Sequence, residues 1–131
     1  MKIFNNILKV VLCLLIVTPI LGVLGVFPEP TAELYNNPEA FTFIKVLFDS
    51  GFVVYLMAIV FAISIILTIK NQMALVALLI LPITLNIVGF HLFLDGGLHT
   101  SGAIMGNVLF LINIYFLWQN RDVYQKLWKR V

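Results

Sequence analysis

Residues 51–94 read GFVVYLMAIVFAISIILTIKNQMALVALLILPITLNIVGFHLFL. Two continuous apolar runs, 51–69 and 73–94, are separated in this stretch by only three polar residues. A helix needs about 20 apolar residues to cross ~30 Å of hydrocarbon, and each run is close to that length. The polar tripeptide leaves room only for a tight turn. The stretch therefore predicts two antiparallel membrane-spanning helices.

Two further apolar runs, 7–27 and 103–118, flank this hairpin. Lipid offers no partners to open backbone groups, and the runs are continuous rather than alternating, so helices are favoured over a barrel. We predict an all-α fold: an antiparallel bundle of four transmembrane helices in a single domain, 1–131. The first run could alternatively be a signal peptide, but it is long for one and no small-x-small cleavage site precedes Phe27.

The high fraction of hydrophobic residues indicates that part of the protein surface is in contact with lipid. The chain has 131 residues, of which 62% are hydrophobic and 11% charged, whereas soluble domains have roughly 45–50% apolar and about 25% charged residues. So short a chain cannot bury that much apolar surface in its own interior. No basic stripe indicates a nucleic-acid partner. The lone Cys13 excludes an intrachain disulfide and a dithiol relay.

The loop charges predict the orientation. With the N-terminus inside, one basic residue, Lys45, lies outside and seven lie inside: Lys2, Lys9, Lys70, Arg121, Lys126, Lys129 and Arg130. This bias follows the positive-inside rule. We therefore expect a multi-pass protein of the bacterial inner membrane with both termini in the cytoplasm.

The long outer connection before the second run should contain an additional helical segment. Asn37 can cap a helix, Pro38 suits its first position and Glu39 favours its positive end. A straight helix from there to the end of the second run would be about 48 Å long, too long for the bilayer. We expect a segment near 38–49 in the outer leaflet, bent at Ser50-Gly51. Lys45 and Asp49 are one turn apart and could pair.

The third run carries the candidate binding residues: Asn86, His91 and Asp95. An ionisable group within a membrane span is a functional hypothesis by default. These residues could contact a cofactor, with quinone as the candidate. Alternatively, a hydrogen bond between His91 and Asp95 could have the purely structural role of stabilising the end of the helix. A haem held by His91 and His99 is disfavoured because both lie at one turn of the chain. Zinc-site spacing, a serine elbow and a phosphate loop are missing from the sequence.

The third run also resembles the signature of the DoxX family of small four-helix membrane proteins. The resemblance rests on Pro82-Ile83-Thr84-x-Asn86-Ile87 and on Phe90-His91-Leu92-Phe93-Leu94-Asp95, and it extends from about Pro28 to Trp128. Gly51, the Asn71-Gln72 hairpin, Asn113-x-Tyr115-x-x-Trp118 and Arg121-x-x-Tyr124 fit the same layout.

The family is named for a subunit associated with a thiosulfate–quinone oxidoreductase, and other relatives are tied to membrane redox complexes or receptor assembly. The resemblance implies a fold more firmly than an activity. Family members often carry an acidic residue midway along the second span, where this chain has Phe61. A phenyl group in place of a carboxylate removes any proton or cation role at that position, which counts against redox or transport chemistry taken from the family.

Three functions follow as hypotheses. The first is a non-catalytic subunit or assembly partner that binds a membrane protein or a second copy of itself. Two observations suggest this role: the sequence contains no recognisable group of catalytic residues, and it has small residues at helical spacing, such as Gly102 and Gly106, which allow helices to pack closely. The second is a quinone-binding component that uses Asn86 and His91, with Phe41, Phe43 and Phe48 around the head group. The third is a small-solute carrier, which the nearly unbroken apolar character of the first two runs disfavours.

Overall fold

The computed structural model describes residues 1–129, and these residues contain no β-strand. The all-α prediction is confirmed. The elements, in chain order, are α1 (Lys2–Val23), the 3-10 helix η1 (Ala32–Leu34), α2 (Pro38–Ser50), α3 (Phe52–Ile69), α4 (Met73–Phe93), α5 (Ala103–Gln119) and α6 (Arg121–Trp128).

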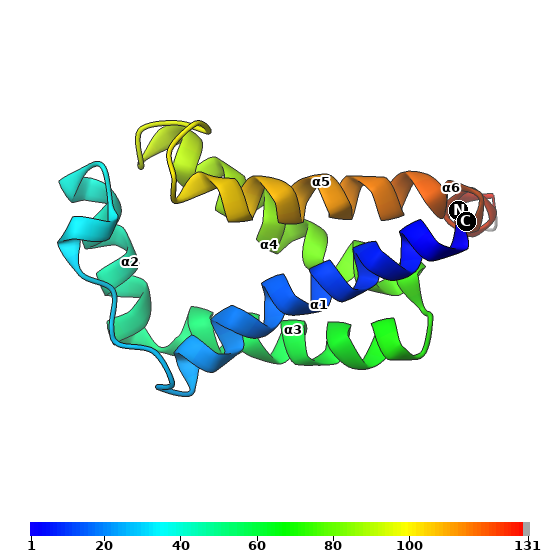
Figure 1. Ribbon diagram of the computed structural model, residues 1–131, viewed down its shortest axis with the longest axis horizontal. Helices are drawn as coiled ribbons and strands as arrows, with labels where there is room; N and C mark the ends of the chain where they lie inside the picture. The colour runs from blue at the N-terminus through cyan, green and yellow to red at the C-terminus, as the bar shows by residue number, and fades with distance from the viewer. Residues whose placement is uncertain (130–131) are drawn as a thin grey trace.

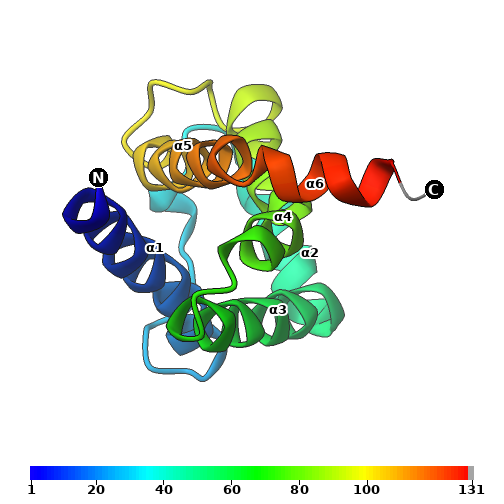
Figure 2. The ribbon, with the colours of Figure 1, turned by 90° about the vertical axis from the view of Figure 1, so that its right-hand side faces the viewer.

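Four helices run along the length of the molecule, and α2 crosses one end of them (Figure 1). Helix α4 packs against both α3 and α5, while α1 packs against α3 and over a shorter stretch against α5. Viewed along the bundle, α3 and α5 lie on either side of α4, α1 lies across the bundle from α4, and α6 points away from the other helices (Figure 2). The N-terminus and α6 lie together at the end opposite α2.

Several helices are suited to a lipid bilayer. Helices α1, α3 and α4 are each long and apolar enough to cross a membrane, and only 11% to 28% of their most apolar stretches is buried inside the chain. Helices α5 and α6 meet these criteria together, although they are bent by 60° at their junction. The structure therefore supports a multi-pass membrane protein with three spans, or four if the bent pair is one span.

The first helix occupies a different range from the run 7–27 expected from hydropathy. It begins five residues earlier, at Lys2, and ends four residues earlier, at Val23. Gly25 adopts φ +77°, and the amides of Gly25 and Val26 donate to the carbonyls of Gly22 and Leu21, both at 3.0 Å. This is the Schellman arrangement, in which a left-handed residue stops a helix whatever the hydropathy of the residues that follow.

The hairpin between α3 and α4 is as short as predicted. Asn71 adopts φ 58°, and the Gln72 amide donates to the Leu67 carbonyl at 2.9 Å, so an asparagine performs the helix-stopping role here. The Lys9 ammonium of α1 donates to the Asn71 side-chain oxygen at 2.8 Å. The hairpin turn is thereby attached to the first helix.

The predicted bend at Ser50-Gly51 is confirmed, because α2 ends at Ser50 and α3 begins at Phe52. Gly51 adopts φ +68°, and a Cβ atom added there would lie 3.0 Å from the Tyr55 ring. Pro38 occupies the first turn of α2, as expected. The suggested pairing of Lys45 with Asp49 was wrong. Among the described residues, neither takes part in an ion pair, and both side chains are exposed.

Replacing Gly51 with alanine should therefore lower the free energy of unfolding by about 1–2 kcal/mol, since a left-handed conformation is costly for residues with a Cβ. The measurement is a denaturation titration of the purified chain in detergent. Gly22→Ala is the matched control, because Gly22 has open space around its Cβ position and an ordinary φ. Equal stability of Gly51→Ala and Gly22→Ala would contradict this account of the bend.

The core lies between the four long helices. Its largest fully buried side chains include Leu12 and Ile16 from α1, Phe61 from α3, Ile80 from α4 and Phe116 from α5. Phe61 is 0% exposed and packs within this cluster. The Phe61 ring is thus part of the hydrophobic core.

Candidate functional site

The end of α4 folds back on itself and brings Asp95 beside His91. The Gly97 amide donates to the His91 carbonyl at 2.8 Å, and Gly96 adopts φ +84°. His91 Nδ1 then lies 2.9 Å from Asp95 Oδ2. The predicted bond between these two side chains is confirmed. Asp95 is only 1% exposed, so its charge depends on the partners that surround it.

The outer connection supplies the remaining partners of Asp95. The Asn36 backbone amide donates to Asp95 Oδ1 at 2.8 Å, and the Asn36 side chain donates to the Asp95 carbonyl at 3.2 Å. The Asn37 side chain donates to the Leu94 carbonyl at 2.8 Å. We call these contacts of Asn36, Asn37, His91, Leu94 and Asp95 the outer clasp. The clasp joins the segment before α2 to the end of α4.

Asn37 departs from its expected role as a side-chain cap. It occupies the position before α2, but its side chain makes no capping bond there and reaches the end of α4 instead. As a cap, the side-chain oxygen of Asn37 would accept a hydrogen bond from a backbone amide in the first turn of α2. Instead, its side-chain nitrogen donates to the Leu94 carbonyl, which has no partner within α4 because the helix ends there. The tertiary contact replaces the local one.

The clasp orients the His91 ring toward α5. The carboxylate beside Nδ1 accepts a hydrogen bond from that nitrogen, which leaves Nε2 as the ring nitrogen without this partner. The two carbons that flank Nε2 face Gly102, at the position just before α5, and Gly106, in α5. Cε1 lies 3.5 Å from a Cβ position on Gly102, and Cδ2 lies 3.8 Å from one on Gly106. These two glycines thus make room for the ring, whose side chain keeps 12% exposure.

An aromatic cluster adjoins His91. Phe90 lies edge-on to His91 with ring centroids 5.0 Å apart, stacks on Phe43 at 6.0 Å and meets Tyr35 edge-on at 6.2 Å. Tyr35 also contacts Phe41. Phe43 is thus separated from His91 by the ring of Phe90, and Phe41 by the rings of Tyr35 and Phe90. The quinone hypothesis also includes Phe48, which lines a separate cavity.

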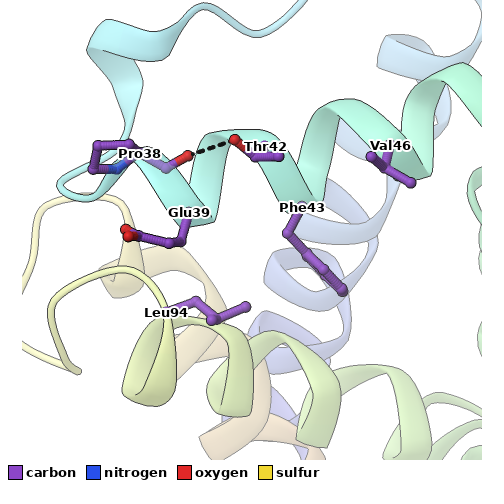
Figure 3. A pocket seen from close by; sticks show the side chains of 6 residues that line it. All are labelled: Pro38, Glu39, Thr42, Phe43, Val46 and Leu94. Atoms are coloured by element: carbon purple, nitrogen blue, oxygen red, sulfur yellow. Dashed lines mark hydrogen bonds between the residues drawn. The ribbon is translucent and has the colours of Figure 1, made fainter.

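A shallow groove of about 530 Å³ borders this cluster between α2 and the end of α4. Figure 3 shows Phe43 and Val46 of α2 on one side, Leu94 on the other and the Glu39 carboxylate near the rim. The groove is open and mostly apolar, and neither His91 nor Asp95 lines it. A ligand in the groove would contact Leu94 but would not contact the side chains of His91 and Asp95.

Asn86 is not part of this constellation. It is exposed, and its side-chain amide donates to the Pro82 carbonyl one turn earlier at 2.7 Å. Five residues along a helix turn the chain by about 140°, which puts Asn86 and His91 on different faces. The structure thus brings together His91 and Asp95 of the predicted set and leaves Asn86 apart. No group of three or more potential metal ligands occurs within residues 1–129.

A second polar contact, between Asn113 of α5 and Thr84 of α4, was not predicted. The Asn113 amide donates to Thr84 Oγ1 at 2.9 Å, and both side chains are 0% exposed. Asn113 Oδ1 has no partner within the described chain. The available signal was the presence of polar side chains within both apolar runs, because such groups pair across helices in lipid.

Tyr35, which lies beside the clasp, should make the stability of the folded chain sensitive to alkaline pH. Burial, followed by the nearby Asp95 carboxylate, raises the pKa of the Tyr35 phenol above its ordinary value of 10.0. The folded state therefore holds this proton more tightly than the unfolded state does. The stability contributed by the neutral phenol is complete below pH 10 and falls as the pH rises from there through the folded-state pKa.

Tyr35→Phe should remove that part of the alkaline loss. The measurement is the unfolding midpoint in detergent between pH 8 and 11.5. The expected result is a shallower decline for Tyr35→Phe than for the unmodified chain. Tyr55→Phe is the matched control, because Tyr55 is an exposed tyrosine and should leave the decline unchanged. Parallel curves for all three proteins would contradict the assignment.

No family model matches this chain, and no curated protein or solved structure matches it. The DoxX resemblance therefore rests on the motif residues themselves. The structure places Thr84, His91, Asp95 and Asn113 of those motifs in contacts that hold helices together. Asn86 is exposed, as are Pro82, Leu92 and Phe93 of the same motifs.

Proposed function

We propose that this chain is a DoxX-like, four-span protein of the bacterial inner membrane and a non-catalytic subunit or assembly partner of a membrane complex. The observation that carries the proposal is the state of Asp95. This carboxylate is 1% exposed and is engaged by the Asn36 amide and by His91. A carboxylate held in this way stabilises the fold and is not presented to a substrate.

The arrangement of charges supports the proposed topology. The N-terminus and α6 lie at one end and α2, which carries Lys45, lies at the other, so the basic residues near the N-terminus and on α6 are separated from α2 by the length of the bundle. Arg130, one of the seven inner basic residues, lies outside the described residues. In this proposal α2 lies in the outer leaflet, and α6 lies at the inner interface after a fourth span formed by α5.

Cysteine accessibility tests this topology. In a Cys13→Ala background, a single cysteine replaces Glu33 in the outer connection or Gln125 in α6, both of which are exposed. A membrane-impermeant maleimide applied to intact spheroplasts should label the first variant and spare the second, and lysis should expose the second. The reverse pattern would invert the orientation.

The proposed role is tested by purifying the tagged chain from its own membrane in a mild detergent. Native mass spectrometry should then give a complex with whole-number stoichiometry, either with a second protein or with further copies of this chain. A monomer that remains alone across several mild detergents and in native nanodiscs would overturn the proposal.

A second candidate function is quinone binding, which the aromatic cluster beside His91 favours. The stacked rings of Phe43 and Phe90 and a histidine nitrogen oriented by a carboxylate are the kinds of groups that orient a quinone head. Titration of the purified chain with ubiquinone and menaquinone is the test. Saturable binding that weakens in His91→Ala and persists in His99→Ala would support it. The absence of saturation, or equal effects of both variants, would exclude it.

A further inference from the structure

A second cavity, of about 310 Å³, lies apart from the outer clasp at the same end of the molecule. Its walls come from the end of α1, from the segment that leads out of α1, and from the corner where α2 meets α3. Its volume lies near the lower limit of small-ligand pockets, which are about 300–1,000 Å³. No residue of the clasp lines it, so it is independent of the proposed function.

Three aromatic side chains line this cavity: Phe27, Phe48 and Tyr55. They come from three different segments, and their exposed fractions are 47%, 38% and 60%. None of them pairs with another aromatic ring among residues 1–129. Gly51 makes this arrangement feasible, because a Cβ atom there would press against the Tyr55 ring at 3.0 Å. The three rings thus line the cavity, remain partly exposed and form no aromatic pair with one another.

The only formal charge on the cavity wall is negative. Glu29 lines the cavity. Its sequence neighbours Pro28 and Pro30 restrict the backbone on either side of it. Glu29 forms no ion pair within the described part of the chain. The C-terminal end of α1, which carries partial negative charge, also lies on the wall. The ends of α2 and α3 that meet at Gly51 have opposite polarity and largely cancel.

Aromatic faces and a carboxylate around a small cavity are the elements that recognise an organic cation. A cation over an aromatic ring is attracted by the negative face of the ring, and this attraction increases when water is excluded. A carboxylate adds direct charge attraction. We propose that the cavity formed by Phe27, Glu29, Phe48 and Tyr55 binds an organic ammonium group, such as that of a quaternary amine.

The test compares ligands of equal shape and different charge on the full chain in detergent. Choline and 3,3-dimethyl-1-butanol, its uncharged counterpart, are titrated by isothermal calorimetry. Choline should bind saturably, and the neutral alcohol should bind at least about tenfold more weakly, a ratio within the range of cation–π effects in a partly desolvated site. Equal affinity for the two compounds, or no saturable binding of choline, would overturn the proposal without reference to any variant.

Variants then locate the site. Glu29→Gln should weaken choline binding by about tenfold, and Tyr55→Leu should weaken it by a similar factor. Glu33→Gln is the matched control, because Glu33 is an exposed acid of the same connection that does not line the cavity. Circular dichroism confirms that each variant is folded before titration. Equal affinities for Glu29→Gln and Glu33→Gln would overturn the assignment to this cavity.

The ammonium group could belong to a lipid head group or to a free solute. Two sets of nanodiscs with the same phosphatidylglycerol content, and hence the same surface charge, are compared: the remaining lipid is phosphatidylcholine in the second set and an uncharged lipid without an ammonium group in the first. Lower apparent affinity for free choline in the second set would identify the lipid as the natural source. Equal affinity in both would identify a free ammonium compound. Failure of choline to bind in either membrane would overturn the proposal, while the complex-forming role would remain testable by native mass spectrometry.

Discussion

Replacing Asp95 with alanine is expected to lower the free energy of unfolding by about 3 kcal/mol. The substitution removes the acceptor of the Asn36 amide and the partner of His91, and hydrogen bonds to charged groups each contribute about 1.5–3 kcal/mol. The loss is partly offset because the buried charge itself is also removed. Denaturation of the purified chain in mixed micelles measures the change.

Two comparisons isolate the cause. Asp95→Asn keeps an oxygen for the Asn36 amide and loses the charge, so its cost should lie between those of the alanine variant and the unmodified chain. Asp49→Ala removes an exposed carboxylate that has no ion-pair partner within residues 1–129, and it should change the free energy by less than about 0.5 kcal/mol. Similar values for Asp95→Ala and Asp49→Ala would show that the outer clasp does not stabilise the fold.

Adding a single methyl group at Gly106 should destabilise the contact between α4 and α5 by about 2 kcal/mol. A Cβ atom there would lie 2.5 Å from Ile87 Cγ2. Isoleucine is branched at Cβ and has one strongly preferred rotamer in a helix, so the methyl group cannot swing away. The helices must separate, and overpacking of this kind costs about 1–3 kcal/mol. The same denaturation experiment on Gly106→Ala tests the expectation.

Gly89→Ala provides the control, since a Cβ atom at Gly89 meets nothing within 4 Å and alanine has the higher helix propensity. This variant should be neutral or slightly more stable. Combining Gly106→Ala with Ile87→Ala removes the colliding methyl group, so the double variant should cost less than the sum of the two single variants. Strict additivity would mean that Gly106 does not set the distance between the helices.

Much of the architecture could be predicted because its causes are local. Hydropathy located all four long helices, and the bend at Gly51 followed from the length of a straight helix relative to the bilayer. The contact between His91 and Asp95 was also within reach, because residues one helical turn apart are neighbours. Each of these inferences needs only the residues of one short segment.

The remaining features depend on contacts that a linear pattern does not contain. Asn36 and Asp95 are 59 positions apart, and Asn37 carried a local signal for a helix cap that a distant carbonyl overrides. The end of α1 was misplaced because Gly25 stops the helix by backbone conformation while apolar residues continue beyond it. Asn86 was grouped with His91 by proximity in sequence, although the helix turns the two side chains apart.

The contact between Tyr115 and Asn5 has a consequence for the order in which the chain is made. The Tyr115 hydroxyl lies 2.7 Å from the Asn5 side-chain oxygen, across 110 positions. At roughly 5–20 residues per second, about 5–20 s of synthesis separate the two partners. Of the two helices that pack most closely on α1, only α3 is made during that interval, because α5 follows α4. The position of the N-terminal part of α1 is therefore completed only when α5 has been made.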